Sequence, residues 1–305
     1  MSNQELNVVT GAFSYTGKYI TRRLLAMGKS VTTLTGHPGR TDEFGEQVRS
    51  APYNFDRPEL LVHSLAGATT LYNTYWVRFD HGTTTFEGAV RNTQTLVQAA
   101  KKAGVQRIVH ISVTNPSLAS PLPYFRGKAR LEEIIQGSGL SYAIIRPTVI
   151  YGLEDILINN IAYLLRKFPL FAIPGSGKYR LQPVFVEDTA EISVQAGEAG
   201  ENMILDAAGP EVFTFDEMVR LIARTTGSRS LALHLPPSIP LLMSGLIGRL
   251  VGDVVLTRDE YQGLAADLLI SSQPPTGHTR MQDWLKANIQ SLGRRYASEL
   301  ERHFK

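Results

Sequence analysis

The sequence predicts a doubly wound α/β fold, in which helices cover both faces of a parallel sheet, with a smaller, mostly helical region toward the carboxyl terminus. Strand-like and helix-like patterns alternate regularly as far as Pro147. A glycine-containing turn joins the first expected strand to the first expected helix. Alternation of this kind is typical of parallel strands joined by right-handed crossovers. Such sheets bind their ligands at the carboxyl ends of the strands.

Short apolar runs, several of them rich in β-branched residues, mark the strands of the first half. We expect strands at residues 7–10, 31–35, 69–73, 107–112 and 142–146. Apolar residues at helical spacing lie between these runs, and a glycine follows several of them. We expect the corresponding helices at residues 19–26, 60–65, 86–103 and 124–136.

The alternation is less regular after Pro147. Residues 182–186 form an apolar run that we expect to return to the sheet as a strand, with a helix beginning at Asp188. Further helices are expected at residues 159–168, 211–225 and 240–251, and residues 281–303 are expected to form a polar amphipathic helix or a pair of helices. We therefore expect a first domain of residues 1–150, to which 178–200 return, and a second region of 151–177 and 201–305 that covers the ligand cleft.

The composition excludes several classes of site and partner. The 305 residues are 43% hydrophobic, and 31 Lys and Arg against 28 Asp and Glu leave a net charge of only +3. Because no long basic block accompanies this small charge, we expect no nucleic-acid partner. The chain has no cysteine, which excludes disulfides, thiolate catalysis and thiolate metal sites. The histidines show no metal-ligand spacing, so we expect no metal.

The amino terminus and the most apolar later stretch favour a cytoplasmic protein. Residues 1–7 are polar and lack the cationic start and apolar stretch of a secretion signal. Glycines, Arg249 and Asp253 interrupt the apolar residues 240–256. That stretch is therefore too short and too polar for a membrane-spanning helix.

The turn after the first strand predicts a dinucleotide site. Residues 10–17 read Thr-Gly-Ala-Phe-Ser-Tyr-Thr-Gly. Glycines at such a turn let the pyrophosphate of a dinucleotide approach the backbone and the amino terminus of the helix. The residues expected to contact the cofactor here are Gly11, Phe13, Ser14, Tyr15, Thr16 and Gly17.

This turn resembles the Thr-Gly-x-x-Gly-x-x-Gly pattern of the extended and atypical short-chain dehydrogenases/reductases, with Ser14 in place of the middle glycine. Tyr124 and Lys128 match the family's Tyr-x-x-x-Lys motif, and residues 146–152 match Arg-Pro-x-x-x-Tyr-Gly. The resemblance covers residues 7–195 in the expected order. It is closest to the branch that includes the NAD(P)-binding accessory subunit of respiratory complex I and to the epimerase/dehydratase group. It implies a Rossmann fold and a bound pyridine nucleotide.

Tyr124 and Lys128 are the expected acid/base pair. They are four residues apart and therefore share one face of a helix. A lysine ammonium beside a phenol favours the phenolate, so the tyrosine can give or take a proton near neutral pH. The resemblance implies that Lys128 also bonds the nicotinamide ribose and that Asn92 takes part in a water relay to this lysine.

The family's catalytic serine aligns with Val113, and hydroxyl residues lie on either side of it. Ser112 and Thr114 are both candidates to bond the substrate oxygen in its place, and strand alternation favours Thr114. If neither hydroxyl reaches the substrate, Tyr124 alone polarises a carbonyl, or the protein binds its cofactor without efficient turnover.

Residues after the second strand bear on the choice of cofactor. An acidic residue there bonds the ribose 2′-hydroxyl of NAD, but no acid precedes Asp42. His37 and Arg40 are available to meet a 2′-phosphate, so NADP(H) is favoured and NAD(H) is the alternative. Further cofactor contacts are expected, by the resemblance, from Asp56, Asn73, Lys128, Pro147 and Val149.

The expected partner is a small-molecule substrate of aromatic or apolar character. Tyr75 and Trp76 follow the strand at 69–73 and are candidates to line its pocket. Asn159 and Arg180 are the polar candidates from the second region. The resemblance further implies a homodimer formed through the helices at 86–103 and 124–136.

Three functions remain open at this point. The first is an NAD(P)(H)-dependent oxidoreductase that transfers hydride to or from a carbonyl or alcohol carbon. The second is a sugar-nucleotide epimerase or dehydratase with NAD as an internal redox carrier; Leu181 stands where such enzymes usually carry an arginine. The third is a non-catalytic NAD(P)-binding sensor or assembly factor, suggested by Ser14 and by the altered serine position.

Overall fold

The computed structural model describes residues 5–39 and 43–300, apart from the side chains of residues 250 and 251. The chain forms two compact units. Unit 1 comprises Met1–Pro147 and Glu187–Ala207, and unit 2 comprises Thr148–Val186 and Ala208–Lys305.

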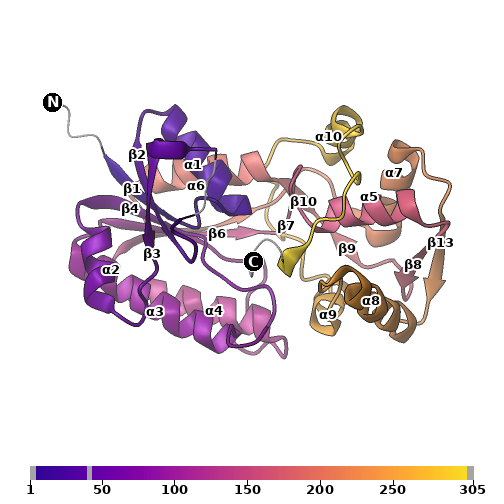
Figure 1. Ribbon diagram of the computed structural model, residues 1–305, viewed down its shortest axis with the longest axis horizontal. Coiled ribbons are helices and arrows are strands. Elements are labelled where there is room, and N and C mark those ends of the chain that lie inside the picture. The colour runs from indigo at the N-terminus through magenta and orange to yellow at the C-terminus, as the bar shows by residue number, and fades with distance from the viewer. Residues whose placement is uncertain (1–4, 40–42, 301–305) are drawn as a thin grey trace. The chain divides into compact units, whose positions relative to one another are not determined.

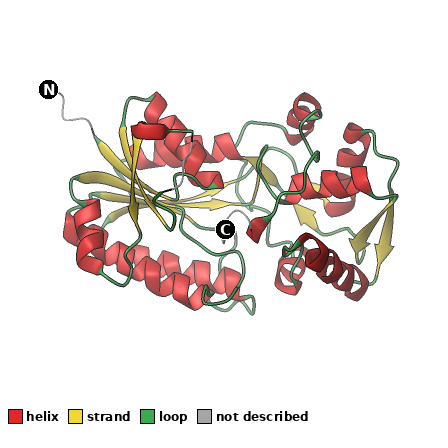
Figure 2. Cartoon of the chain, in the orientation of Figure 1, coloured by secondary structure: helices red, strands yellow, loops and turns green. Residues whose placement is uncertain are grey.

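Unit 1 is built on a parallel sheet of seven strands in the order β11-β6-β5-β4-β1-β2-β3 (Figures 1 and 2). The strands are β1 (Leu6–Thr10), β2 (Ser30–Thr35), β3 (Val48–Pro52), β4 (Ala68–Asn73), β5 (Arg107–Ile111), β6 (Ser141–Pro147) and β11 (Met203–Ala207). All neighbouring pairs run parallel. The predicted fold class is therefore confirmed. The strand order reverses between β1 and β4, where doubly wound sheets bind their ligands.

Helices cover both faces of this sheet (Figure 1). On one face lie α1 (Tyr15–Ala26) and α6 (Val186–Glu198); on the other lie α2 (Pro58–Leu65), α3 (Phe86–Ala103) and α4 (Pro123–Gln136). The long helix α3 has strong local signals at both ends. The Thr85 hydroxyl accepts from the amide of Gly88 at its start, and Gly104 adopts φ 81° at its end, a left-handed conformation that favours glycine.

The predicted return of 182–186 to the main sheet is wrong. In the structure β10 (Pro183–Phe185) pairs with β7 (Val149–Tyr151) inside unit 2. The seventh strand of the main sheet is instead β11, which pairs with β6 through Met203 to Ala207. A short apolar run can form a strand in either sheet, and only long-range pairing decides between them. The sequence analysis also missed β3, whose exposed residues weaken the apolar pattern.

Unit 2 combines short two-stranded sheets with helices. Besides the β7–β10 pair, β8 (Leu170–Pro174) pairs with β13 (Leu231–Leu235), and β9 (Arg180–Leu181) pairs with β12 (Phe213–Thr214). Its helices are α5 (Leu157–Lys167), α7 (Phe215–Thr226), α8 (Ser238–Val251), α9 (Arg258–Ala265) and α10 (Met281–Asn288). Residues 281–303 do not form one continuous helix: α10 ends at Asn288, turns follow it, and helical residues begin again at Glu299, as the alternative of a pair of helices expects.

Candidate functional site

The turn between β1 and α1 brings helix and strand close together. Gly11 has φ 65°, which favours glycine, and its amide donates to the Leu34 carbonyl on β2 at 2.8 Å. A Cβ on Gly17 would lie 2.1 Å from the Gly11 carbonyl oxygen. Only glycine therefore permits this approach of α1 to the turn.

Ser14, which replaces the middle glycine of the family pattern, stabilises the turn. Its amide and its hydroxyl both donate to the Gly11 carbonyl, at 2.8 and 2.6 Å. The hydroxyl is thus directed into the loop, and it does not cap α1. The serine keeps the turn tight through its own hydrogen bonds.

The amino terminus of α1 fits a phosphate group. The first amide to donate within the helix is that of Lys18, which bonds the Ser14 carbonyl at 2.9 Å. The preceding amides, of Tyr15, Thr16 and Gly17, come before the first intrahelical bond and are suited by position to an anion. No acidic side chain lies in this turn to repel a phosphate. This part of unit 1 therefore fits the pyrophosphate of a pyridine dinucleotide.

A hydrogen-bond network joins the carboxyl ends of β1, β4 and β5. The Thr10 hydroxyl accepts from the amides of Thr74 and Tyr75, at 2.7 and 3.1 Å, and contacts Asn73 Oδ1 at 3.2 Å. Asn73 Nδ2 lies 3.1 Å from Nδ1 of His110. Asn73 thus fixes the start of the loop that carries the aromatic residues.

His110 is fully buried on β5, and its other ring nitrogen, Nε2, has no hydrogen-bond partner among the described residues. Burial lowers its pKa well below the ordinary value, and the Lys128 cation lowers it further. His110 is therefore a neutral imidazole at physiological pH, and Asn73 holds its ring in place.

Three aromatic rings surround the functional end of α4. Trp76 lies at ring-centroid distances of 5.9 Å from Tyr124 and 5.7 Å from Phe86, and Tyr124 lies 6.1 Å from Phe86. The indole also lies over Gly127, where a Cβ would be 2.6 Å from it. We call Trp76, Phe86 and Tyr124 the aromatic cage. Its indole Nε1 is buried and has no hydrogen-bond partner in the described parts of the chain.

Lys128 is buried beside this cage, with 3% of its surface exposed. Its ammonium donates to the Ile111 carbonyl at 2.7 Å and lies 4.9 Å from the Trp76 ring centroid. Burial lowers the pKa of Lys128 to about 7, against the opposing attraction of the Glu132 carboxylate. Lys128 therefore changes charge near neutral pH.

The structure gives Ser112 a carboxylate partner. Its hydroxyl donates to Glu132 on α4 at 2.5 Å, and Glu132 also forms an ion pair with Arg146 on β6. Ser112 and Glu132 are 4% and 3% exposed. Thr114 is fully buried and donates a long, 3.4 Å hydrogen bond to Asp206 on β11. Both candidate hydroxyls thus bond carboxylates within unit 1.

A second aromatic group lies beside the loop after β4. The Tyr75 ring packs on Tyr53 and Phe55 at centroid distances of 5.1 and 5.0 Å. Asn92 Nδ2 donates to the Tyr75 hydroxyl at 2.8 Å. Asn92 therefore bonds Tyr75 of this loop. Burial raises the pKa of Tyr75, and the hydrogen bond from Asn92 opposes this rise.

The remaining expected cofactor residues are spread over several elements. His37 is exposed directly after β2, and Arg40 lies outside the described residues. Asp56 is exposed, with Arg57 at 3.7 Å. Phe13 packs near Phe44, with ring centroids 6.4 Å apart. Two others flank the boundary of the units: Pro147 ends β6 in unit 1, and Val149 begins β7 in unit 2.

The two polar candidates from unit 2 bond protein groups there. Asn159 donates to the Arg295 carbonyl at 2.9 Å and accepts from the Gly293 amide at 3.0 Å. The Arg180 guanidinium forms an ion pair with Asp267 at 3.0 Å. Asn159 thus fixes the segment after α10, and Arg180 links β9 to the segment after α9.

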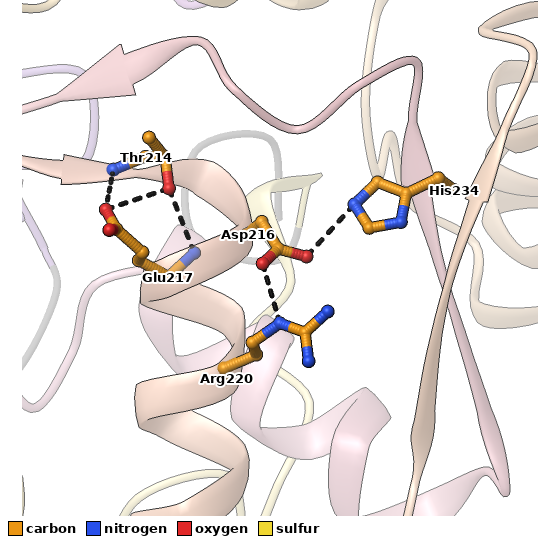
Figure 3. Close-up of polar contacts among 5 residues, drawn as sticks. All are labelled: Thr214, Asp216, Glu217, Arg220 and His234. Atoms are coloured by element: carbon orange, nitrogen blue, oxygen red, sulfur yellow. Dashed lines mark hydrogen bonds and ion pairs between the residues drawn. The ribbon is translucent and has the colours of Figure 1, made fainter.

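A further polar cluster begins α7 (Figure 3). Thr214 and Glu217 form a reciprocal capping box, and the hydrogen bonds from Thr214 lower the pKa of Glu217. Asp216 bonds Arg220 at 2.6 Å and lies 3.0 Å from His234 Nε2 on β13. These contacts stabilise the first turn of α7, so we assign them a structural role. Among the residues that the structure describes, no three His, Asp or Glu side chains are placed to hold a metal ion together.

Sequence reasoning missed Phe86 and Gly127 as parts of the site. Phe86 is the first residue of α3, and Gly127 is three residues after Tyr124 on the face of α4. A glycine within a Tyr-x-x-x-Lys motif could have indicated a packed aromatic ring, because it leaves room for a ring against the helix. The partner ring, that of Trp76, comes from the loop after β4, and its contact with Gly127 could not be identified from local sequence.

The site lies in a segment with known relatives. Residues 11–155 match the family described as NAD(P)H-binding. A curated relative from Arabidopsis thaliana, the mitochondrial NADH dehydrogenase [ubiquinone] 1 alpha subcomplex subunit 9, is 26% identical over 86% of this chain and 70% of its own length. A 4-hydroxy-2-methyl-3-oxo-4-farnesyl-3,4-dihydroquinoline-1-oxide ketoreductase from Stigmatella aurantiaca is also 26% identical, over 75% of each chain.

A solved structure shows the same fold. The triphenylmethane reductase of Citrobacter sp., complexed with NADP(H), superposes with a TM-score of 0.75 at 16% identity, over 92% of this chain and 99% of that chain. Together these matches confirm the resemblance to the extended and atypical short-chain dehydrogenases/reductases and the NAD(P)-binding fold. No helix in the described parts of the chain has the length and hydropathy needed to cross a membrane.

Proposed function

From the NAD(P)H-binding segment and the aromatic cage, we propose that this protein is an NAD(P)(H)-dependent oxidoreductase, with NADP(H) as the preferred cofactor. Its substrate is an aromatic or otherwise apolar small molecule with a carbonyl or alcohol group. The observation that carries the proposal is the placement of Tyr124 and Lys128 one turn apart on α4, with the Trp76 ring in contact with both. The similar ketoreductase of Stigmatella aurantiaca is named for a farnesyl-substituted dihydroquinoline oxide, which supports this substrate class.

We propose the following roles for the residues of this chain. The turn at Gly11–Gly17 and the start of α1 bind the pyrophosphate, and exposed His37 meets the 2′-phosphate. The nicotinamide supplies the hydride. The Tyr124 hydroxyl gives its proton to the substrate oxygen, and the charge on Lys128 favours the resulting phenolate. Trp76 and Phe86 offer an apolar surface that excludes water from this step. We retain Tyr75 and Trp76 as substrate contacts and assign Asn159 and Arg180 to the folding of unit 2.

The test is the Tyr124→Phe variant, assayed for NADPH oxidation with a panel of aromatic ketones and quinones. We expect kcat to fall at least about 100-fold, because the proton donor is lost. Calorimetric titration should show an unchanged NADPH affinity, and tighter binding of NADPH than of NADH by the wild type. Tyr142→Phe, on β6 away from the cage, is the matched control. Equal turnover by Tyr124→Phe and wild type would exclude this mechanism.

A second candidate is a non-catalytic NAD(P)H-binding subunit. It is favoured by the contacts of Lys128 with Ile111 and of Ser112 with Glu132, and by the relative named as a subunit of NADH dehydrogenase. On this alternative NADPH binds, but no member of the panel accelerates its oxidation above the rate without protein.

A further inference from the structure

Helix α8 carries an apolar face that no described part of the chain covers. Ile239, Leu242, Met243 and Leu246 are 43%, 68%, 42% and 52% exposed. Their spacing of three, four and seven residues places them on one face of the helix. We call these four residues the α8 apolar face. So many large apolar side chains together on one exposed face are typical of an interaction surface.

The two strands next to α8 in unit 2 expose further leucines. β8 and β13 pair in parallel with Leu170 opposite Leu231, so that both side chains lie on the same face of this small sheet. Leu170, Leu231 and Leu233 are 53%, 64% and 41% exposed. Pro236 and Pro237 connect this sheet directly to α8 (Figure 1).

The charges along the segments that form this surface are mostly positive, and exposed Asp259 follows Arg258 at their end. In residues 227–258 the charged side chains are Arg229, Arg249, Asp253 and Arg258. Asp253 is buried and accepts hydrogen bonds from the Tyr296 hydroxyl and from backbone amides, so it is not available at the surface. The three arginines are exposed. Arg249 is seven residues after Leu242 and therefore extends the α8 apolar face at its end.

An apolar face with a cationic border complements an anionic lipid surface. Acyl chains accept the leucines, and negative headgroups accept the arginines. A second copy of this chain fits less well, because a two-fold interface would set the same cationic borders against each other. The 14 residues of α8 span about 21 Å, less than the ~30 Å hydrocarbon core, so the helix would lie along the surface.

We propose that the α8 apolar face and its arginines dock this protein reversibly on an anionic membrane surface. The proposal concerns unit 2 and is independent of the chemistry at Tyr124. A protein held there would meet apolar substrates where they concentrate.

The test is flotation of the purified full-length chain with vesicles of phosphatidylcholine, alone or mixed with phosphatidylglycerol. We expect the wild type to float with the mixed vesicles and to be released by high salt. Leu242→Gln with Leu246→Gln should weaken this binding by at least about tenfold, because two inserted side chains are lost. Arg249→Glu should weaken it by roughly fivefold or more.

The matched control is Leu118→Gln with Leu153→Gln, which alters two leucines of similar exposure, 47% and 49%, away from α8. This control should bind as the wild type does. Circular dichroism and NADPH titration of every variant establish that folding is retained. If the double leucine variant fails to fold, Arg249→Glu and the salt series still decide the question.

Two results would overturn the proposal. One is that the wild type fails to float with either vesicle, or that the Leu242/Leu246 variant floats equally well. The other is that the wild type forms a dimer in analytical ultracentrifugation that this variant abolishes, without vesicle binding. The face would then be an interface between two copies of the chain.

Discussion

Lys128 illustrates how a single buried residue can control both stability and chemistry. Its ammonium has a carbonyl and an aromatic face as neighbours but only 3% exposure to water. Desolvation outweighs the attraction of Glu132 and lowers the pKa of Lys128 to about 7. The folded protein therefore loses this proton at a much lower pH than the unfolded chain, in which the pKa is near 10.5.

This shift predicts a pH dependence of folding. Between pH 7 and pH 10.5 the unfolded chain binds more protons than the folded one, so stability rises with pH through this window, and below it the cost of burying the charge is constant. The Lys128→Met variant lacks this contribution. We expect the free energy of unfolding of the wild type, relative to Lys128→Met, to increase by about 2 kcal/mol from pH 7 to pH 9.

Urea unfolding of both proteins at several pH values measures this difference. Groups that titrate elsewhere affect both proteins equally, so the subtraction isolates Lys128. Parallel stability profiles would show that Lys128 keeps an ordinary pKa in the folded protein.

At the scale of elements, the junction of β1 and α1 depends on one small residue. Gly17→Ala places a Cβ 2.1 Å from the Gly11 carbonyl, so the helix must move away from the turn. We expect a loss of about 1–3 kcal/mol of stability, and weaker NADPH binding because the helix amides shift. Gly200→Ala is the control, because nothing lies within 4 Å of its added Cβ. Denaturant titration and calorimetry give the two quantities; equal values for both variants would contradict the argument.

A second element-scale prediction concerns Asp253, which follows α8. Its carboxylate accepts from the Tyr296 hydroxyl at 2.9 Å and from the amides of Glu299 and Leu300 at 3.1 Å each. Asp253→Asn replaces one acceptor by a donor that faces these N–H groups. We expect a cost of about 1–3 kcal/mol, seen locally as faster hydrogen exchange at Glu299 and Leu300.

Asp259→Asn, which removes an exposed charge nearby, is the control for this prediction and should leave exchange at those amides unchanged. Unchanged exchange in Asp253→Asn itself would show that other contacts hold the carboxyl-terminal segment.

At the scale of the whole molecule, each unit is stabilised by core residues of its own. The core on the α2–α3 side of unit 1 gathers residues from Val8 to Ile144, and that of unit 2 gathers residues from Val149 to Leu292. The cofactor turn, the aromatic cage and the Lys128 environment all belong to unit 1. The α8 apolar face belongs to unit 2. The two proposals therefore concern surfaces with separate structural support, and each can fail without the other.

The sequence by itself determined most elements of the first half, β3 excepted, and the order of its motifs. Strand and helix periodicity are local properties, so α3 was predicted at its observed bounds and the turn at Gly11 was placed between the correct elements. The glycine at position 17 could likewise be interpreted from its place between strand and helix.

Only the tertiary structure decided which side chains meet. Ser112 bonds Glu132, which also pairs with Arg146, because neighbouring parallel strands and a crossover helix bring these three together. Trp76 reaches Lys128 because the loop after β4 packs against α4. Long-range pairing also decided that β11, and not the expected strand β10, joins the main sheet. Local sequence specifies that a strand forms, whereas its partner and the neighbours of its side chains depend on contacts between distant residues.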